Sequence, residues 1–161
     1  MLKFLKKISM ALVFIMCIGV MTSCFGGSSN KKVSMTTDEL YKKATEKIEL
    51  PSLEKVSSSE LEGLMGISSS DVEDASVYIS MINVIASEIG IFKFSSPEQE
   101  KAIDKGIEQR LADLEATWSR YLPEQYELVK NVKKFTFGNV KGYVIADDAS
   151  KIVSNLENAT K

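Results

Sequence analysis

Residues 87–122, SEIGIFKFSSPEQEKAIDKGIEQRLADLEATWSRYL, contain the two patterns that decide the fold. In the second half of this stretch, apolar residues recur every three or four positions through about 25 residues, which is the period of an amphipathic helix. The residues of this stripe are Ile103, Ile107, Leu111, Leu114, Trp118 and Leu122. Ser96 and Gln99 have the spacing of a capping box, and Pro97 suits the first helical position. We therefore expect a helix that begins after Ser96 and ends where Pro123 interrupts the stripe.

The first half of the same stretch belongs to a predicted strand, residues 85–94, whose side chains alternate between two faces. One face has Ile85, Ile89 and Ile91, and the other has Ala86, Glu88, Gly90, Phe92 and Phe94. Residues 77–81 alternate in the same way, and Asn83 between the two runs suits a tight turn, so an antiparallel hairpin is expected. A second pair of strands, residues 132–137 and 141–146, flanks a glycine–asparagine turn.

Further helices are predicted around these strands. Residues 37–48 have apolar side chains on one face, and Thr36 begins a capping box with Glu39. Residues 124–130 are expected to form a short helix after the proline. Asp147 is expected to cap a last helix, which has its apolar face at Ala149, Ile152, Val153 and Leu156.

The order of these elements predicts the fold class. Residues 52–73 are rich in serine and glutamate, and we expect them to be mostly loop. The remaining order, α-β-β-α-β-β-α, predicts an α+β fold in which a small antiparallel sheet of about four strands packs on helices at one side.

The first residues have the pattern of a bacterial export signal. Three lysines within the first seven positions precede an uncharged apolar run, residues 8–21, which is shorter than the roughly 20 residues of a spanning helix. The run ends in Met-Thr-Ser-Cys at residues 21–24, which resembles the bacterial lipobox with Met21 where leucine is usual. This resemblance implies cleavage after Ser23 and attachment of lipid to Cys24. An uncleaved N-terminal anchor and an ordinary signal cut nearby are the alternatives.

These features predict three segments. Residues 1–23 are a lipoprotein signal peptide, residues 24–35 are the lipidated cysteine with a flexible Gly/Ser tether, and residues 36–161 are a single extracytoplasmic domain. Two acyl chains anchor a protein stably where one does not, so we expect Cys24 to hold the domain on the outer face of the cytoplasmic membrane. An envelope protein or polymer is the expected partner.

The composition disfavours several classes of function. After the signal lysines are removed, 17 basic and 22 acidic residues remain without a basic stripe, which disfavours nucleic-acid binding. The chain has no histidine, Cys17 is removed with the signal, and acylation blocks Cys24. These absences exclude Ser-His-Asp and Cys-His catalysis and histidine-ligated metals, so no cofactor or metal is expected.

Four segments of the mature chain resemble a known family: residues 87–93, the helix around Arg110, residues 121–128 and residues 143–148. The family consists of small lipoproteins of low-GC Gram-positive bacteria and is catalogued as domain of unknown function 4358. Its members usually read Gly-Asn-Tyr-Val near the last strand, whereas this chain reads GNVKGY at residues 138–143. The resemblance implies a membrane-anchored extracytoplasmic domain, and it implies no activity.

Two charged residues are candidates for a functional site. Glu88 lies in an otherwise apolar strand, where burial raises the pKa of a carboxyl group and suits it to acid–base work. The alternative is a carboxylate at a sheet edge, or one that pairs with Lys93 or Arg110. Arg110 lies beside the apolar stripe, where its planar guanidinium suits an anionic ligand or, alternatively, an acid of the protein itself.

Aromatic and acidic residues supply weaker candidates. Tyr121 and Tyr126 could line a pocket at the helix break together with Trp118, although the helical spacing of Trp118 favours a place in the core. Asp147 and Asp148 suggest a metal ligand pair, but a helix start explains two acids, and a calcium loop needs more oxygen ligands at regular spacing.

Three functions are therefore compatible with the sequence. The anchor, the tether and the missing catalytic residues favour a binding or interaction module, and an enzyme is not expected. The second hypothesis is a one-lobe lipoprotein that captures a small molecule for a transporter. The third is an enzyme that depends on carboxylates such as Glu88.

Overall fold

The computed structural model describes residues 32–161, which form an α+β domain of five helices and five strands. The elements in chain order are α1 (Thr37–Thr45), β1 (Leu53–Lys55), α2 (Ser58–Met65), β2 (Asp74–Ser80), β3 (Glu88–Lys93), α3 (Pro97–Trp118), α4 (Pro123–Lys130), β4 (Lys133–Phe137), β5 (Val140–Ile145) and α5 (Ala149–Ala159). The strands form one antiparallel sheet in the order β1-β2-β3-β5-β4. The predicted class and the antiparallel sheet are confirmed, with one strand more than expected.

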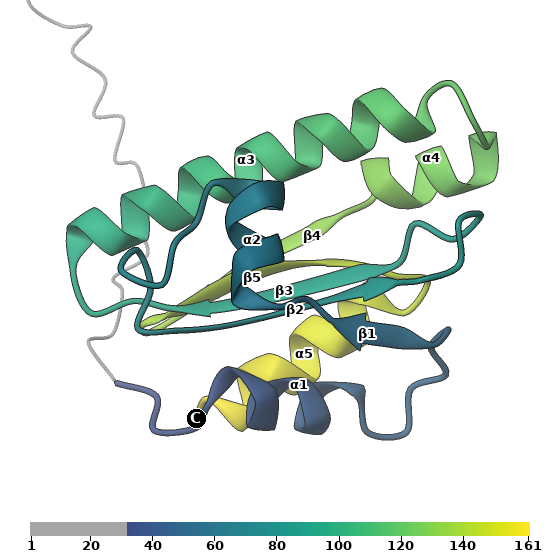
Figure 1. Cartoon of the computed structure of the whole chain (residues 1–161). Helices are drawn as coiled ribbons and strands as arrows, with labels where there is room; N and C mark the ends of the chain where they lie inside the picture. Colours follow the sequence, from purple (N-terminus) through teal and green to yellow (C-terminus); the bar gives the residue numbers. More distant parts are fainter. Residues whose placement is uncertain (1–31) are drawn as a thin grey trace, which may run out of the picture.

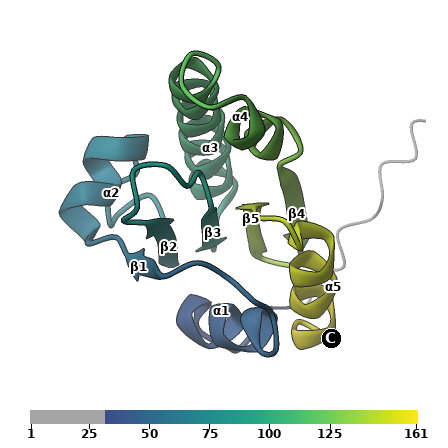
Figure 2. The same cartoon turned by 90° about the vertical axis from the view of Figure 1, so that its right-hand side faces the viewer.

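Helices cover both faces of the sheet. Figures 1 and 2 show α1 and α5 on one face and α2, α3 and α4 on the other. The expected one-sided arrangement is therefore wrong. The physical reason is that β3 and β5 lie inside the sheet with all six residues of each strand buried, so both faces of these strands need a cover.

The predicted division of residues 85–94 into two faces is confirmed. Ile89 and Ile91 belong to the core that contains α1 and α5, whereas Ala86 and Phe92 belong to the core that contains α2 and α3. The hairpin of β2 and β3 is also confirmed, but its connection is longer than a tight turn and spans residues 81–87.

The long helix α3 begins as predicted. The Ser96 hydroxyl accepts a hydrogen bond from the Gln99 N–H at 3.3 Å, and Pro97 lies in the first turn. The Gln99 side chain accepts from the N–H of Ser95 rather than that of Ser96, so the predicted capping box is only half formed. The helix ends at Trp118, earlier than the predicted stripe, and Leu122 instead precedes α4 as its N-cap.

Residues 52–73 contain more structure than the predicted loop. They form the edge strand β1 and the helix α2, which has a complete capping box between Ser57 and Glu60. Gly66 ends α2 in the left-handed conformation with a φ of 64°. The capping-box spacing was visible in the sequence, but two short elements separated by polar residues give no long apolar period.

The last helix begins differently from the prediction. Asp148 rather than Asp147 is the N-cap of α5, and its side chain makes no capping hydrogen bond. The predicted cap is therefore wrong, although the apolar face is confirmed, because Ala149, Ile152 and Leu156 are buried.

The packed domain begins before the predicted boundary at residue 36. Val33 is buried, and its N–H donates to the Asn139 side chain at 2.8 Å. Lys32 pairs with Glu73 at 3.2 Å. The predicted signal peptide, Cys24 and most of the predicted tether lie outside the described residues. Among residues 32–161, no helix is both long and apolar enough to cross a membrane.

Candidate functional site

Glu88 and Arg110, both predicted as site residues, form an ion pair inside the domain. Arg110 donates from Nε to Glu88 Oε1 at 2.9 Å and from Nη2 to Glu88 Oε2 at 2.6 Å. The Glu88 side chain is 3% exposed and that of Arg110 is 15% exposed. Because β3 supplies the carboxylate and α3 supplies the guanidinium, this two-point contact holds the long helix on the sheet.

Tyr143 of β5 completes this cluster and was not predicted. Its hydroxyl donates to Glu88 Oε1, and its ring is fully buried. The ring has room because Gly90 is its partner across the strands, where an added Cβ would meet the Tyr143 ring. Gly142 allows β5 to lie close to β3, because a Cβ at position 142 would overlap the Gly90 carbonyl oxygen.

The electrostatics of the cluster keep the Arg110 guanidinium charged and the Tyr143 phenol protonated. Burial alone disfavours the charged form of Arg110, but the hydrogen bonds and charge of Glu88 raise the pKa of the guanidinium overall. Burial and the neighbouring carboxylate raise the pKa of Tyr143 well above its ordinary value. The phenol therefore stays a donor and the guanidinium stays charged, which is the arrangement of a structural ion pair.

The two predicted tyrosines do not join this cluster. Tyr121 is 57% exposed in the connection between α3 and α4, with its ring 5.9 Å from that of Trp118. The Tyr126 hydroxyl donates to Glu115 at 3.2 Å, and Lys130 lies 5.0 Å from the centre of the Tyr126 ring. Trp118 itself is buried in the core, as its helical spacing predicted.

A second polar cluster, also missed in the sequence, fixes α1 to the sheet. The Asp38 carboxylate accepts hydrogen bonds from Ser76 and Tyr78 of β2 and from Lys55 of β1. Burial works against the ionised form of Asp38, but these donors together lower the pKa of the carboxyl group. The Tyr78 ring stacks on that of Tyr41 with centroids 3.6 Å apart. Ser76 is 1% exposed, so we interpret this cluster as a structural contact that joins α1 to β1 and β2.

The most unusual surface feature is the connection from β2 to β3. Met81, Ile82 and Val84 in this connection are 61%, 45% and 49% exposed, and we refer to residues 81–84 as the apolar loop. A hydrogen bond of 2.8 Å from the Ala86 N–H to the Gln125 side chain ties the end of the connection to α4. In the sequence this loop corresponds to MINVI at residues 81–85, four apolar residues around Asn83, where two strand ends and a tight turn are expected.

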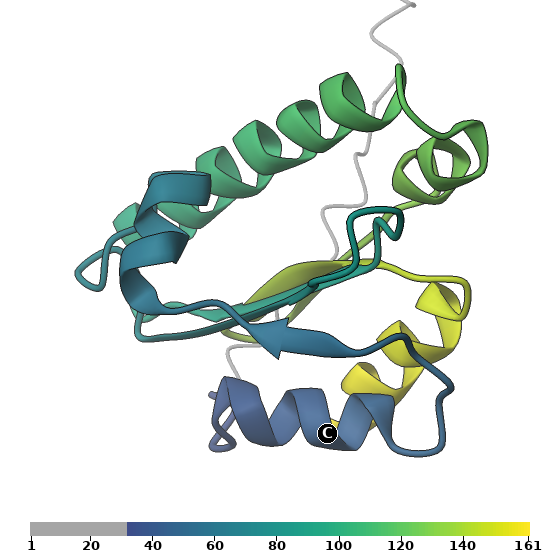
Figure 3. The ribbon, with the colours of Figure 1, turned by 45° about the vertical axis from the view of Figure 1, so that its right-hand side comes forward.

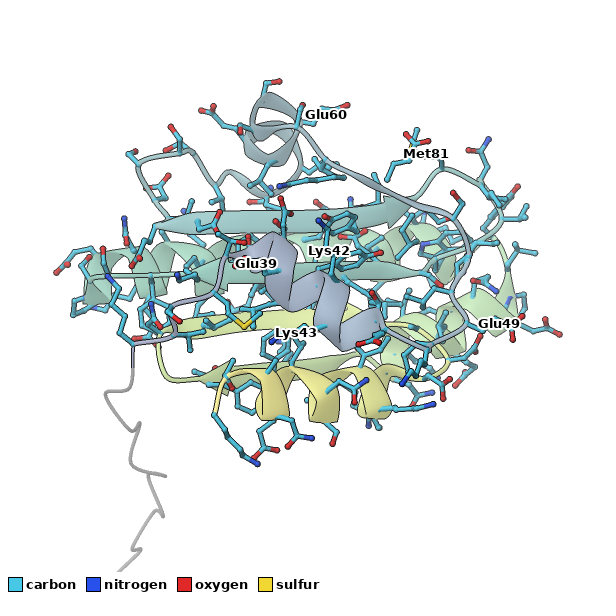
Figure 4. All side chains as sticks on the ribbon, turned by 90° about the horizontal axis from the view of Figure 1, so that it is seen from below. Glu39, Lys42, Lys43, Glu49, Glu60 and Met81 are labelled. Carbon is cyan, nitrogen blue, oxygen red and sulfur yellow. The ribbon has the colours of Figure 1, made fainter. Side chains whose placement is uncertain are left out.

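A hollow of about 460 Å³ adjoins the apolar loop; we call it the α2 hollow. Its lining residues are Glu54, Lys55, Val56, Glu60, Gly63, Leu64, Ile79 and Met81. Figure 4 shows Glu60 and Met81 along the same edge of the molecule. A Cβ added to Gly63 would meet no atom within 4 Å, so the α2 backbone is open to the hollow at this position.

Of the two acidic residues predicted as weak metal candidates, Asp147 but not Asp148 lines a different hollow of about 410 Å³ between α4 and the start of α5. Its other lining residues include Glu124, Glu127 and Lys133. Across residues 32–161, no group of three or more cysteine, aspartate or glutamate side chains is arranged to hold a metal ion.

Residues 46–146, well over half of the chain, match a protein family described as "Domain of unknown function (DUF4358)". The match confirms the resemblance to domain of unknown function 4358 and extends it to β1, α2 and β2. No curated protein and no solved structure matches the chain.

Proposed function

The chain belongs to the DUF4358 family, and on that premise we propose that it is a membrane-tethered extracytoplasmic binding module whose partner is an envelope protein. The observation that carries this proposal is the apolar loop. Three large apolar side chains, Met81, Ile82 and Val84, are each between 45% and 61% exposed within four residues. Clustered apolar exposure of this kind is typical of protein contact sites, because it costs solvation free energy until a partner covers it.

The position of the loop supports the same proposal. Lys32, the first residue that the structure describes, pairs with Glu73, which immediately precedes β2. The apolar loop follows the last residue of β2, so the two features lie at opposite ends of this strand. Because β2 has seven residues, the two ends are about 20 Å apart. A domain tethered through residues preceding Lys32 therefore presents the apolar loop at the end opposite its attachment.

The cluster of Glu88 and Arg110 is better explained as structure than as a catalytic centre. The two side chains satisfy each other, and Glu88 is 2% exposed. Neither residue lines the α2 hollow or the hollow beside Asp147. The geometry thus adds nothing to the hypothesis of a carboxylate-dependent enzyme.

The alternative of small-molecule capture would use the α2 hollow, whose volume of about 460 Å³ lies within the range of ligand sites. A thermal-shift screen with a panel of metabolites tests it. A ligand that raises the unfolding temperature of the wild-type chain but not of a Gly63→Leu variant would favour capture over the protein partner.

Crosslinking in intact cells tests the proposed function. A photoreactive amino acid placed at Ile82 or Val84 should yield one discrete protein adduct of constant mass. The same amino acid at Lys101, an exposed residue of α3, is the matched control and should not yield that adduct. Absence of the adduct at both loop positions, or its equal yield at Lys101, would contradict the proposal.

The membrane attachment is tested separately. Cells fed an alkyne-labelled fatty acid should label the wild-type protein, and a Cys24→Ser variant should lose the label. An unlabelled wild-type protein would refute the lipid anchor without bearing on the apolar loop.

A further inference from the structure

The outer edge of β1 leaves main-chain groups without partners. β1 is the terminal strand of the sheet and pairs only with β2. The Val56 N–H donates to the Val77 carbonyl at 2.8 Å, and bonded pairs alternate along an antiparallel ladder, so Leu53 and Lys55 direct their N–H and C=O groups away from β2. No acceptor for these two N–H groups is found among the described residues. Figure 3 shows β1 in the foreground, at the side of the sheet.

The α2 hollow lies beside this edge and has an apolar floor. Val56 is buried, and Leu64 and Ile79 are partly buried. These three side chains form the apolar floor, on which an apolar group of a partner can pack. Val56 and Glu54 share one face of β1, since alternate residues of a strand do so. A strand added outside β1 would therefore direct every second side chain toward the hollow.

Gly63 is the feature that the fold itself does not require. It lies inside α2, where glycine is less favourable than alanine. Neither a positive φ nor a crowded Cβ position accounts for it, because a Cβ would point into open space. Close approach of another chain to the helix backbone is a physical reason for glycine at such a position.

The rim of the hollow is negatively charged. Glu54 and Glu60 both line it, whereas the single lysine of the lining, Lys55, is neutralised by Asp38 at 2.7 Å. The Glu60 carboxylate is held by the Ser57 capping box, which lowers its pKa and keeps it ionised. The rim therefore favours a partner with positive charges on either side of its apolar group.

We propose that β1 and the α2 hollow together bind an extended segment of the partner protein, which adds as a strand outside β1, places an apolar side chain beside Gly63 and carries basic residues opposite Glu54 and Glu60. This inference rests on the proposed function and names the kind of segment that the module recognises. Main-chain hydrogen bonds to Leu53 and Lys55 supply affinity, and the hollow and its rim supply specificity.

Peptide binding to the full-length chain in nonionic detergent micelles tests the inference. The dye-labelled probe is Lys-Val-Leu-Val-Lys, whose first, third and fifth side chains share a face when it is extended. Fluorescence anisotropy should show that Glu-Val-Leu-Val-Glu binds about tenfold more weakly, because its charges oppose the rim. Lys-Val-Pro-Val-Lys should bind equally weakly, because proline cannot donate in a ladder. Micelles without protein report any partition of the probe into detergent.

Variants of the chain locate the site. Gly63→Leu fills the hollow and should weaken the Lys-Val-Leu-Val-Lys probe about tenfold, whereas Ala112→Leu, which adds the same side chain to an exposed position of α3, should leave its binding unchanged. The double variant Glu54→Gln/Glu60→Gln should abolish the preference for the basic over the acidic peptide. Glutamine at position 60 preserves the capping box, so loss of folding is not an expected cause.

Equal binding of the basic and acidic peptides, or an unchanged affinity in Gly63→Leu, overturns the inference. The proposed function fails by a different result, namely the absence of a crosslinked adduct at Ile82 and Val84. If a specific adduct forms at Ile82 or Val84 but the basic and acidic peptides bind equally well, the proposed binding module is retained and the strand-addition site is rejected.

Discussion

At the scale of single residues, the domain depends on one buried ion pair. Glu88 and Arg110 are separated by 22 positions in the chain and meet between sheet and helix, with Tyr143 as a third partner. A buried ion pair contributes little net stability when complete, but the loss of one member leaves a buried charge without a partner. The structural role of the pair is therefore best measured by removing one of its two members and measuring the change in stability.

Removal of Arg110 should destabilise the domain. Arg110→Met should lower the free energy of unfolding by about 3 kcal/mol at pH 7, because the buried Glu88 side chain loses its ion-pair partner. Urea unfolding measures this loss. The control Arg120→Met removes an exposed arginine and should change stability by less than about 0.5 kcal/mol. A loss for Arg110→Met no larger than that of the control would contradict this account.

At the scale of elements, the helices are fixed by different means. α3 has a long apolar face and a proline start, whereas α2 is short and relies on the Ser57 capping box and the left-handed Gly66. α1 is held through Asp38, which reaches two strands. Short helices gain most of their stability from such tertiary contacts rather than from intrinsic propensity.

Two helical glycines should respond to alanine in opposite directions. Gly63→Ala in α2 should raise the free energy of unfolding by about 0.5–1 kcal/mol, because the new methyl group meets no atom and the helix gains propensity. Gly106→Ala in α3 should lower it, since the Cβ would collide with the Ile67 side chain and the Met65 carbonyl oxygen. Thermal or urea unfolding compares the two variants. Destabilisation by Gly63→Ala would show that the helix needs this glycine for its own folding.

At the scale of the whole molecule, the first described residues and the apolar loop lie at opposite ends of the sheet. Residues 32 and 33 join the domain next to Glu73 and Asn139, and the apolar loop emerges at the far end of β2. The α2 hollow continues from the loop along the β1 edge. The proposed function therefore places membrane attachment and partner recognition at different parts of the surface.

Global stability should fall in acid, partly through Asp38. The pKa of this carboxyl group is lowered in the folded state, so its contribution is present above the ordinary value of 3.8 and is lost as the pH falls through the folded value. Urea midpoints measured from about pH 7 to pH 3 should therefore decrease for the wild type below about pH 4. Asp38→Asn should start less stable and decrease less over this range, whereas the exposed-site control Asp113→Asn should follow the wild type. Parallel curves for Asp38→Asn and the wild type would reject the assignment.

The sequence by itself determined the α+β class, the β2–β3 and β4–β5 hairpins, the start of α3 and the family, because each of these follows from local periodicity, capping residues or contiguous motifs. It also brought Glu88 and Arg110 forward as candidates and included their pairing among the alternatives. Its prediction of a lipid anchor at Cys24 stays a prediction.

Only the tertiary structure decided the two-sided covering of the sheet, the order of its strands, the edge position of β1, the contact of Tyr143 with Glu88 and the α2 hollow. These features depend on residues that lie far apart in the chain and meet through packing. Tyr143 and Glu88, for example, are 55 positions apart. Local patterns specify which face of a strand is apolar, but what covers that face is set by the free energy of burying all the apolar surfaces of the chain together.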